Sequence, residues 1–271
     1  MRLVFDIISI GLVKYIMFKI LKKKFLNKSV SYMKLYAPLV AKNAQAGQFL
    51  ILRIDEFGER IPLTIFDYDR ENGTVEIIYQ KVGTTTLKLD RKQEGEYLLD
   101  VVGPLGNKSE IKGFKKAIVV SGGVGSAIAY PLAKELKSNG TKTMAILGFR
   151  NKDFVVLEDE FKELANELIL TTDDGSYSEK GFAIDFLKKD VKDGKIDCIF
   201  SCGPLPMLKA VRNYAIEKNI PCQISLEEKM GCGLGVCLGC AVKTAESSSE
   251  KPEYVHVCKA GPVFEAKNVE I

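Results

Sequence analysis

Residues 115–140 read KKAIVVSGGVGSAIAYPLAKELKSNG, a buried strand followed directly by a glycine-rich turn and a helix. The AIVV segment is apolar at every position and rich in β-branched side chains, as expected for a strand covered on both faces. The helix should end at Gly140, and Pro131 should either kink it or mark its first turn. This order indicates the first half of a β-α-β unit in a parallel sheet.

The same alternation continues to about residue 226. Helix-length segments separate short apolar runs, which predicts an α/β domain over residues 113–226 with helices on both faces of a parallel sheet. The predicted strands are KTMAILGF, LILTTDD, DCIFSCG and CQISLE, and the predicted helices are LEDEFKELANE, KGFAIDFLKKDVK and LPMLKAVRNYAIEKN.

The residues before this domain have a different pattern. Short runs of β-branched and aromatic residues alternate with turn signals such as Asn72-Gly73 and Glu94-Gly95. They predict a β-sandwich or β-barrel over residues 17–112. The predicted strands are GQFLILRI (47–54), IPLTIFDY (61–68), GTVEIIYQKV (73–82) and EYLLDVVGP (96–104).

Bulk composition limits the class of protein. The 271 residues are 46% apolar and 27% charged, with a net charge of +4 and one histidine. No basic surface with interleaved aromatics is visible, so no nucleic acid is expected. The odd number of cysteines, seven, argues for a reducing compartment, and we expect a cytoplasmic protein.

Met17 is interpreted as the real start of the protein, with residues 1–16 as an extension. Charged residues interrupt the apolar run, which leaves it too short for a membrane span, and no small-residue cleavage site is present. An amphipathic surface helix is the alternative.

Residues 227–271 lose the β-α alternation and contain four of the seven cysteines. The spacing is C-x4-C-x2-C in MGCGLGVCLGC (230–240), with a fourth cysteine after seventeen further residues. This is the plant-type [2Fe–2S] spacing, whereas structural zinc sites use two C-x2-C pairs or cysteines with histidines. We predict a [2Fe–2S] cluster, with zinc or purely structural cysteines as alternatives. The predicted ligands are Cys232, Cys237, Cys240 and Cys258, while Cys198 and Cys222 should be small buried side chains.

Two strand-to-helix turns are candidate nucleotide sites. In SGGVG, Gly122, Gly123 and Gly125 allow a pyrophosphate to approach the N-terminus of the next helix, although such glycines can serve packing alone. In SCGPLPM, Cys202 follows a central strand at the sheet edge where ligands bind, and a thiol there could lie against a flat ring. A buried cysteine before a Gly-Pro helix start is the alternative.

The barrel contains two further candidate segments. In ERIPLTI, Arg60 can make a forked contact with phosphate, and Thr64 can donate a hydrogen bond to a ring nitrogen. In VGTTTLKL, Gly83 and the hydroxyls that follow it are candidate phosphate contacts, with a solvated turn as the alternative.

Together these segments resemble the ferredoxin–NADP reductase superfamily, on the motifs R-x-P-L-T, G-T-T-T, S-G-G-V-G and C-G-P-L-P-M. The ending CGLGVCLGC…VCKAGPVF resembles the electron-transfer subunits of two-subunit dihydroorotate dehydrogenases. Residues 59–89 resemble the small subunits of NADH-dependent ferredoxin:NADP oxidoreductases and related sulfide dehydrogenases. The resemblance covers residues 17–271.

The resemblance implies FAD in the barrel, NAD(H) on the α/β domain and [2Fe–2S] at the C-terminus. Some members of the ferredoxin:NADP oxidoreductase group have Asp as the first cluster ligand, where this chain has Cys232. By this resemblance the flavin contacts are Arg60, Pro62, Leu63 and Thr64, the pyrophosphate contacts are Gly83, Thr84 and Thr85, the nicotinamide side is Gly122, Gly123, Gly125, Cys202, Gly203 and Pro204, and the candidate catalytic residues are Thr64 and Cys202.

The strand ending TTDDGS bears on the choice of nucleotide. Asp173 and Asp174 can accept hydrogen bonds from ribose hydroxyls and would repel a 2′-phosphate, whereas Arg150 would attract one. We predict a preference for NADH over NADPH.

These parts predict an electron-transfer subunit. Nicotinamide gives up two electrons as hydride, a [2Fe–2S] cluster takes one at a time, and flavin converts between them. No site for a final substrate is recognisable, so we expect a hetero-oligomer with a larger catalytic flavoprotein or iron–sulfur subunit, or with ferredoxin, docking near residues 230–264. The preferred interpretation is a subunit like that of NADH-dependent ferredoxin:NADP oxidoreductase. The alternatives are the electron-transfer subunit of dihydroorotate dehydrogenase, a FAD/iron–sulfur redox sensor and a zinc-stapled binding module.

Overall fold

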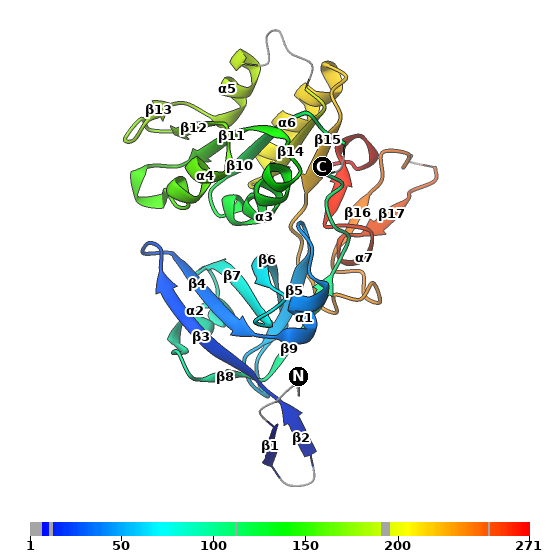
Figure 1. Ribbon diagram of the computed structural model, residues 1–271. Helices are drawn as coiled ribbons and strands as arrows, with labels where there is room; N and C mark the ends of the chain where they lie inside the picture. The colour runs from blue at the N-terminus through cyan, green and yellow to red at the C-terminus, as the bar shows by residue number, and fades with distance from the viewer. Residues whose placement is uncertain (1–6, 11–12, 112, 191–195, 249) are drawn as a thin grey trace.

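The computed structural model describes residues 7–10, 13–111, 113–190, 196–248 and 250–271. An antiparallel barrel comes first, an α/β domain follows, and a cysteine-containing C-terminal segment packs beside both (Figure 1). The predicted combination of a β-barrel and a parallel-sheet domain is confirmed.

The barrel is built from strands whose alternate side chains face a shared core. Leu50 and Leu52, for example, are fully buried in it. The elements are β3 (Phe18–Phe25), β4 (Val30–Tyr36), α1 (Pro38–Asn43), β5 (Phe49–Arg53), β6 (Ile61–Asp69), β7 (Thr74–Gln80), α2 (Thr84–Arg91), β8 (Tyr97–Leu98) and β9 (Asp100–Leu105).

The barrel sheet is antiparallel, in the order β8-β3-β4-β7-β6-β5-β9. Its two edge strands, β8 and β9, are separated in the chain only by Leu99, whose N–H donates to the carbonyls of Arg53 and Ile54. Because consecutive residues form opposite edges, the sheet curls into a nearly closed barrel.

The α/β domain follows the predicted alternation, and two helices cover each face of its sheet. On one face lie α3 (Gly125–Ser138) and α4 (Glu158–Leu164), and on the other lie α5 (Ala183–Asp190) and α6 (Leu205–Glu217). The strands are β10 (Lys116–Gly122), β11 (Lys142–Phe149), β12 (Glu167–Thr172), β13 (Glu179–Lys180), β14 (Cys198–Cys202), β15 (Cys222–Ser225) and β18 (Val263–Glu265).

The order of this sheet is β13-β12-β11-β10-β14-β15-β18, parallel except for β18. From β10 the chain moves outward through β11 and β12, then returns to the other side of β10 at β14. The reversal makes the carboxyl ends of β10 and β14 a topological switch point, where ligands of open α/β sheets bind.

Residues 226–262 leave the sheet and carry four cysteines. The cysteine loop (residues 230–240) leads into β16 (Ala241–Lys243), β17 (Tyr254–His256) and α7 (Val257–Ala260), after which β18 returns to pair with β15. A 3-10 turn (Ala266–Asn268) follows. Asn107, between the two domains, donates from its backbone N–H to the Gly261 carbonyl (2.6 Å) and from Nδ2 to the Ala260 carbonyl (2.7 Å). The segment is therefore tied to the sheet edge and to the interdomain link.

Direct contacts join the barrel to helix α3. The rings of Phe66 and Tyr130 stack with centroids 4.4 Å apart, and the Tyr68 hydroxyl donates to Glu135 Oε1 at 2.9 Å. Since both contacts connect β6 to α3, the two domains are held in one arrangement and the space between their ends is preformed.

Two expectations from the sequence meet a different outcome. Pro131 lies inside α3, beyond the first turn, so it does not mark the start of the helix. The predicted extension contains a hairpin, β1 (Ile7–Ile10) and β2 (Val13–Ile16), in place of the alternative amphipathic helix (Figure 1), and its residues 1–6 and 11–12 lie outside the described residues. Among the described residues, no helix is long and apolar enough to cross a membrane.

Candidate functional site

Two glycine turns lie side by side at the switch point. Ser121 of β10 pairs with Cys202 of β14, so the strands end together. A Cβ on Gly125 would lie 2.4 Å from the Cys202 carbonyl oxygen, and a Cβ on Gly203 would lie 2.8 Å from the Gly122 nitrogen. Close packing of the two turns therefore requires these glycines, whatever else they contact.

Gly123 is in a different environment. Its φ is +56°, and a Cβ there would meet open space. Next to it begins α3, where the N–H groups of Ser126 and Ala127 donate to the Gly123 and Val124 carbonyls (3.2 and 2.9 Å) and the positive end of the helix dipole faces the turn. Gly123 is therefore the glycine of this turn that leaves room for a ligand at the helix N-terminus.

A cleft of about 610 Å³ lies between the barrel and the carboxyl edge of the α/β sheet. Its size is in the range of cofactor sites. Three of the predicted flavin contacts line it, all on β6: Pro62, Leu63 and Thr64. Its other walls come from β5 and β7, from the start of α3, and from the chain that leaves β15. These walls include Phe49, Ile78, Val124, Ile128, Leu226, Glu227, Glu228, Lys229, Met230 and Pro262.

The predicted pyrophosphate segment forms the N-terminus of α2 (Thr84–Arg91), and its first residues, 82–84, are exposed. Thr86 Oγ1 accepts the N–H groups of Val82 and Gly83, each at 3.1 Å, which fixes the first turn. Thr85 Oγ1 donates to Glu59 Oε2 at 2.8 Å. Gly83 faces open space, so the start of the helix is accessible.

Arg60 precedes β6 and is paired with a carboxylate. Its Nη2 lies 2.8 Å from Asp100 Oδ2, and its side chain is 40% exposed. An exposed ion pair of this kind contributes little to stability, so the guanidinium can exchange its partner for a phosphate at small cost.

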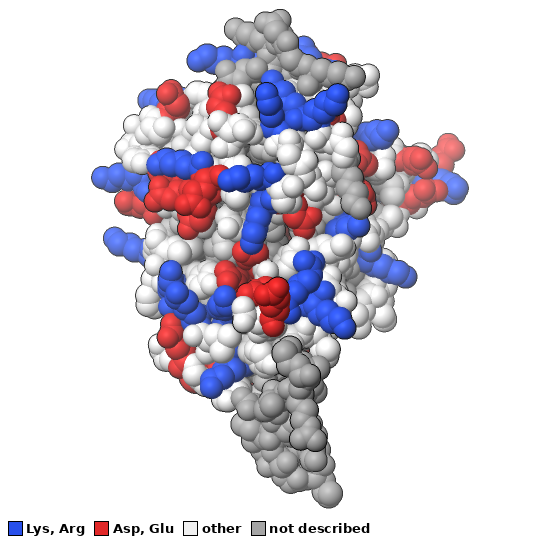
Figure 2. Space-filling view, in the orientation of Figure 1, with Lys and Arg blue, Asp and Glu red and all other residues white. Residues whose placement is uncertain are grey.

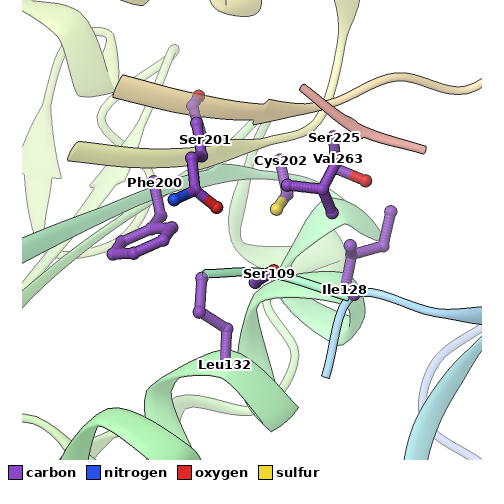
Figure 3. Close-up of a pocket in the computed structure, with 10 residues that line it drawn as sticks. Ser109, Ile128, Leu132, Phe200, Ser201, Cys202, Ser225 and Val263 are labelled. Carbon is purple, nitrogen blue, oxygen red and sulfur yellow. The ribbon is translucent and has the colours of Figure 1, made fainter. Parts of the chain in front are cut away.

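The Cys202 thiol points into a small cavity behind the cleft (Figure 3). The cavity holds about 10 Å³, room for about one water molecule, and shares Ile128 and Ser225 with the cleft. Burial, and next the nearby Glu227 carboxylate, raise the pKa of Cys202 well above its usual range. The thiol is therefore neutral at physiological pH and a poor nucleophile.

Glu227 is a candidate that the sequence pattern does not mark. Its side chain is open to the cleft yet has protein on most sides, and burial raises its pKa. A carboxyl that faces the cleft beside the Cys202 thiol can hold a proton or a hydrogen bond there. The only sequence signal is SLEEK, which spans the end of a predicted strand, a position where exposed acids are common.

Asp173 and Arg150 come together at the carboxyl ends of neighbouring strands. Phe149 of β11 pairs with Thr172 of β12, which puts the following residues side by side. Partial burial raises the pKa of Asp173, and the positive charge of Arg150 opposes that shift. The Arg150 guanidinium also lies 5.5 Å from the centroid of the Phe154 ring. Asp173, predicted to bind the ribose, and Arg150, predicted to attract a 2′-phosphate, therefore lie close together.

The cysteine loop aims backbone N–H groups at sulfur. Those of Cys237, Leu234 and Val236 each donate to Cys232 Sγ at 3.4 Å and lower the pKa of this thiol to about 6. Three donors on one sulfur favour the thiolate, which is the form that binds metal.

The four sulfurs form two pairs. The Cys237 side chain, after three backbone N–H groups, lowers the pKa of Cys232, and burial, then the Cys240 side chain, raise that of Cys258, while Gly235 N–H donates to Cys258 Sγ at 3.2 Å. In the described part of the chain, no three His, Cys, Asp or Glu side chains converge on one metal position. Two pairs fit the two irons of a [2Fe–2S] cluster, whereas zinc requires all its ligands around one point.

The charged surface does not add a further site on the face shown in Figure 2. There, Lys and Arg are interspersed with Asp and Glu over both domains. The candidate site is therefore defined by the cleft and the cysteine loop.

Comparison with known proteins gives consistent relatives. Residues 227–270 match the family model of the iron–sulfur cluster binding domain of dihydroorotate dehydrogenase B. A homolog of the electron-transfer subunit of dihydroorotate dehydrogenase B (NAD(+)) from Thermotoga maritima is 39% identical over 252 residues, 93% of this chain and 87% of that protein. The electron-transfer subunit from Fusobacterium nucleatum is 39% identical over 90% of this chain and 94% of its own.

Two solved structures extend the comparison. A chain of NADH-dependent reduced ferredoxin-NADP oxidoreductase has a TM-score of 0.85 at 38% identity, over 93% of this chain and 89% of its own. Phthalate dioxygenase reductase has a TM-score of 0.65 at 17% identity, over 95% and 98%, which is a likeness of fold alone.

Replacing Cys237 with Ser should reduce iron from about two atoms per chain to near zero, because one iron would lose a thiolate. Replacing Cys222 with Ser should leave iron content unchanged, since Cys222 is buried in β15, 4% exposed. Iron and sulfide analysis after anaerobic purification measures both. Full iron loading of Cys237→Ser would contradict the ligand assignment.

Replacing Asp173 with Asn should raise kcat/KM for NADPH about tenfold, or about 1.4 kcal/mol, with little change for NADH, because one repelling charge is removed. Asp174→Asn is the matched control. The Asp174 carboxylate already accepts the Ser176 N–H at 2.9 Å, so its removal should matter less. Steady-state reduction of ferricyanide measures the constants, and a wild-type chain that prefers NADPH would show that these acids are misplaced.

Proposed function

The chain belongs to the family of dihydroorotate dehydrogenase B electron-transfer subunits and their homologues, and on that premise we propose that it passes electrons between NAD(H), FAD and a [2Fe–2S] cluster to a partner subunit. One observation carries the proposal. The cleft at the switch point is lined by residues 226–230, which lead directly into the cysteine loop. One chain therefore holds neighbouring sites for all three carriers. NAD(H) donates a hydride, FAD converts two electrons into single electrons, and the cluster passes these on one at a time.

The residues of the cleft supply positioning. When bound there, FAD accepts a hydride and releases electrons singly, which no side chain of this protein can do. Thr64 presents a hydroxyl from β6 that can donate to a ring nitrogen. Cys202, neutral because it is buried, lies in the small cavity behind the cleft, and Glu227 in the cleft wall can hold a hydrogen bond to a nucleotide there. Such side chains would act by holding the flavin and nicotinamide rings in the correct relative position.

The partner subunit differs between the two subgroups that this chain resembles. The longer flavin-domain segment, residues 59–89, and the TM-score of 0.85 support a role like that of NADH-dependent ferredoxin:NADP oxidoreductase. The family match over residues 227–270, together with Cys232 at the first ligand position, supports the electron-transfer subunit of dihydroorotate dehydrogenase. The partner that co-purifies from the native cells separates the two.

The anaerobic whole chain should show flavin and [2Fe–2S] absorption that bleaches with NADH, since the hydride would enter the flavin and its electrons would reach the cluster. Cys237→Ser is the control, and in it only the flavin absorption should remain and bleach. A colourless zinc protein would reject the proposal. Bound FAD and cluster that NADH does not reduce would favour the redox sensor.

The cysteine loop exposes apolar side chains next to the predicted ligands. Leu234, Val236 and Leu238 are 62%, 83% and 80% exposed. Exposed apolar side chains that gather on one loop mark an interaction surface. We propose that the partner subunit docks on this loop, where its own redox group could approach the sulfurs.

Replacing Leu238 with Lys should weaken partner binding about tenfold, because a charge would be buried in the interface. Reduction of ferricyanide by NADH should not change. Leu39→Lys on α1, where Leu39 is 58% exposed, is the matched control and should keep full affinity. Affinity can be measured by titration with the co-purified partner. A native protein that runs only as a monomer, or a single chain that oxidises dihydroorotate or reduces NADP unaided, would contradict the subunit assignment.

A further inference from the structure

Gly233 of the cysteine loop packs directly against the barrel. Its φ is +69°, and a Cβ built on it would lie 2.0 Å from Ile51 Cδ1 and 3.6 Å from Leu105 Cδ1. Non-bonded carbon atoms are attractive at about 3.5–4 Å and repel strongly well inside that range. A side chain at this position would fit only if Ile51 or the loop moved, so the loop backbone rests on the Ile51 side chain.

Ile51 lies next to the wall of the cleft, although it does not line it. Alternate residues of β5 face outward from the barrel, and Phe49 and Ile51 are the apolar ones among them. Phe49 lines the cleft and pairs with Thr64, while Ile51 pairs with Pro62, which lines it too. Two residues along a strand span about 7 Å. The contact with Gly233 is therefore one side-chain repeat away from the cleft.

The predicted ligands lie in the same packed layer. Cys240 and Cys258, 1% and 3% exposed, belong to the apolar core that contains Phe49 and Ile51. A close-packed interior transmits a displacement instead of absorbing it. A shift of the loop on Ile51 would therefore shift the sulfurs relative to the cleft.

We propose that the contact between Gly233 and Ile51 sets the separation of the cluster from the flavin, which makes Gly233 a positioning residue for the transfer between them. The inference rests on the proposed function. One NADH supplies two electrons as hydride. Two single-electron steps then reoxidise the flavin, each reducing the cluster by one electron that passes to the partner, and the flavin protons return to water. An electron can pass between two centres that are not bonded to each other, and the rate of that transfer falls steeply as their separation grows. The separation that this contact fixes therefore sets the rate of both steps.

The test uses the whole chain with its FAD and cluster. Gly233→Ala should slow reduction of the cluster by the flavin about tenfold, because the added methyl group would push the loop away from Ile51. Rapid mixing with NADH separates the events: flavin bleaching reports hydride transfer and should be unchanged, and freeze-quench EPR reports the reduced cluster. Iron content and the EPR spectrum after dithionite reduction should match the wild type.

A second substitution, at Ile51, removes the atom that the added methyl group of Gly233→Ala would meet. Ile51→Val lacks Cδ1, and the next contact of the added methyl group would be Ile51 Cγ1 at 3.2 Å, so Gly233→Ala/Ile51→Val should recover most of the rate. Gly235→Ala is the matched control for backbone strain. Its φ is +78°, but its Cβ would meet only the flexible Lys259 side chain, at 3.0 Å. Ile51→Val should not rescue any defect of Gly235→Ala.

The outcomes separate the inference from the function beneath it. If Gly233→Ala keeps its full iron content and its cluster is reduced as fast as in the wild type, the inference about Gly233 is wrong and the proposed function stands. The same holds for a slow Gly233→Ala that Ile51→Val fails to rescue. A wild-type chain in which NADH reduces the flavin but never the cluster would overturn the proposed function as well. If Gly233→Ala loses its cluster, Ile51→Phe enlarges the same contact without altering the loop, and an unchanged rate there would also refute the inference.

Discussion

The rest of the structure depends on the close approach of the two turns that follow β10 and β14. The Gly125 position, 2.4 Å from the Cys202 carbonyl once a Cβ is added, leaves no room for a side chain. This packing puts the start of α3 and the Cys202 thiol at one edge of the sheet, and the contacts between α3 and β6 then bring the barrel against that edge. The cleft exists because these two interfaces share α3.

The path of the chain after β15 gives the cysteines a fixed relation to that cleft. The strand is followed directly by cleft-lining residues and then by the cysteine loop, and β18 comes back to pair with β15. Asn107 holds the return segment from the interdomain side. A loop anchored at both ends on rigid elements can position a redox centre more precisely than a free C-terminal tail.

Much of this arrangement could be predicted from sequence because its signals are local. The β-α alternation, the barrel strands and the cysteine spacing each depend on residues close together in the chain. The contact of Gly233 with Ile51 and the position of Glu227 beside Cys202 join segments far apart, and neither residue type is unusual in its own segment. The helix that begins after Gly83 was not predicted, because its threonines are as common in turns; in the structure Thr86 accepts two N–H groups and fixes the first turn.

The cysteines show why residue type alone cannot assign a role. Cys202 and Cys232 carry the same thiol, but the structure drives their protonation in opposite directions. Burial and a nearby carboxylate keep Cys202 neutral, whereas three backbone N–H groups lower the pKa of Cys232 to about 6. A neutral thiol suits a surface against a ring, and a thiolate suits iron. Because the glycines of the loop are what let successive N–H groups turn toward one sulfur, the same small residues that permit the approach to Ile51 also prepare the ligand.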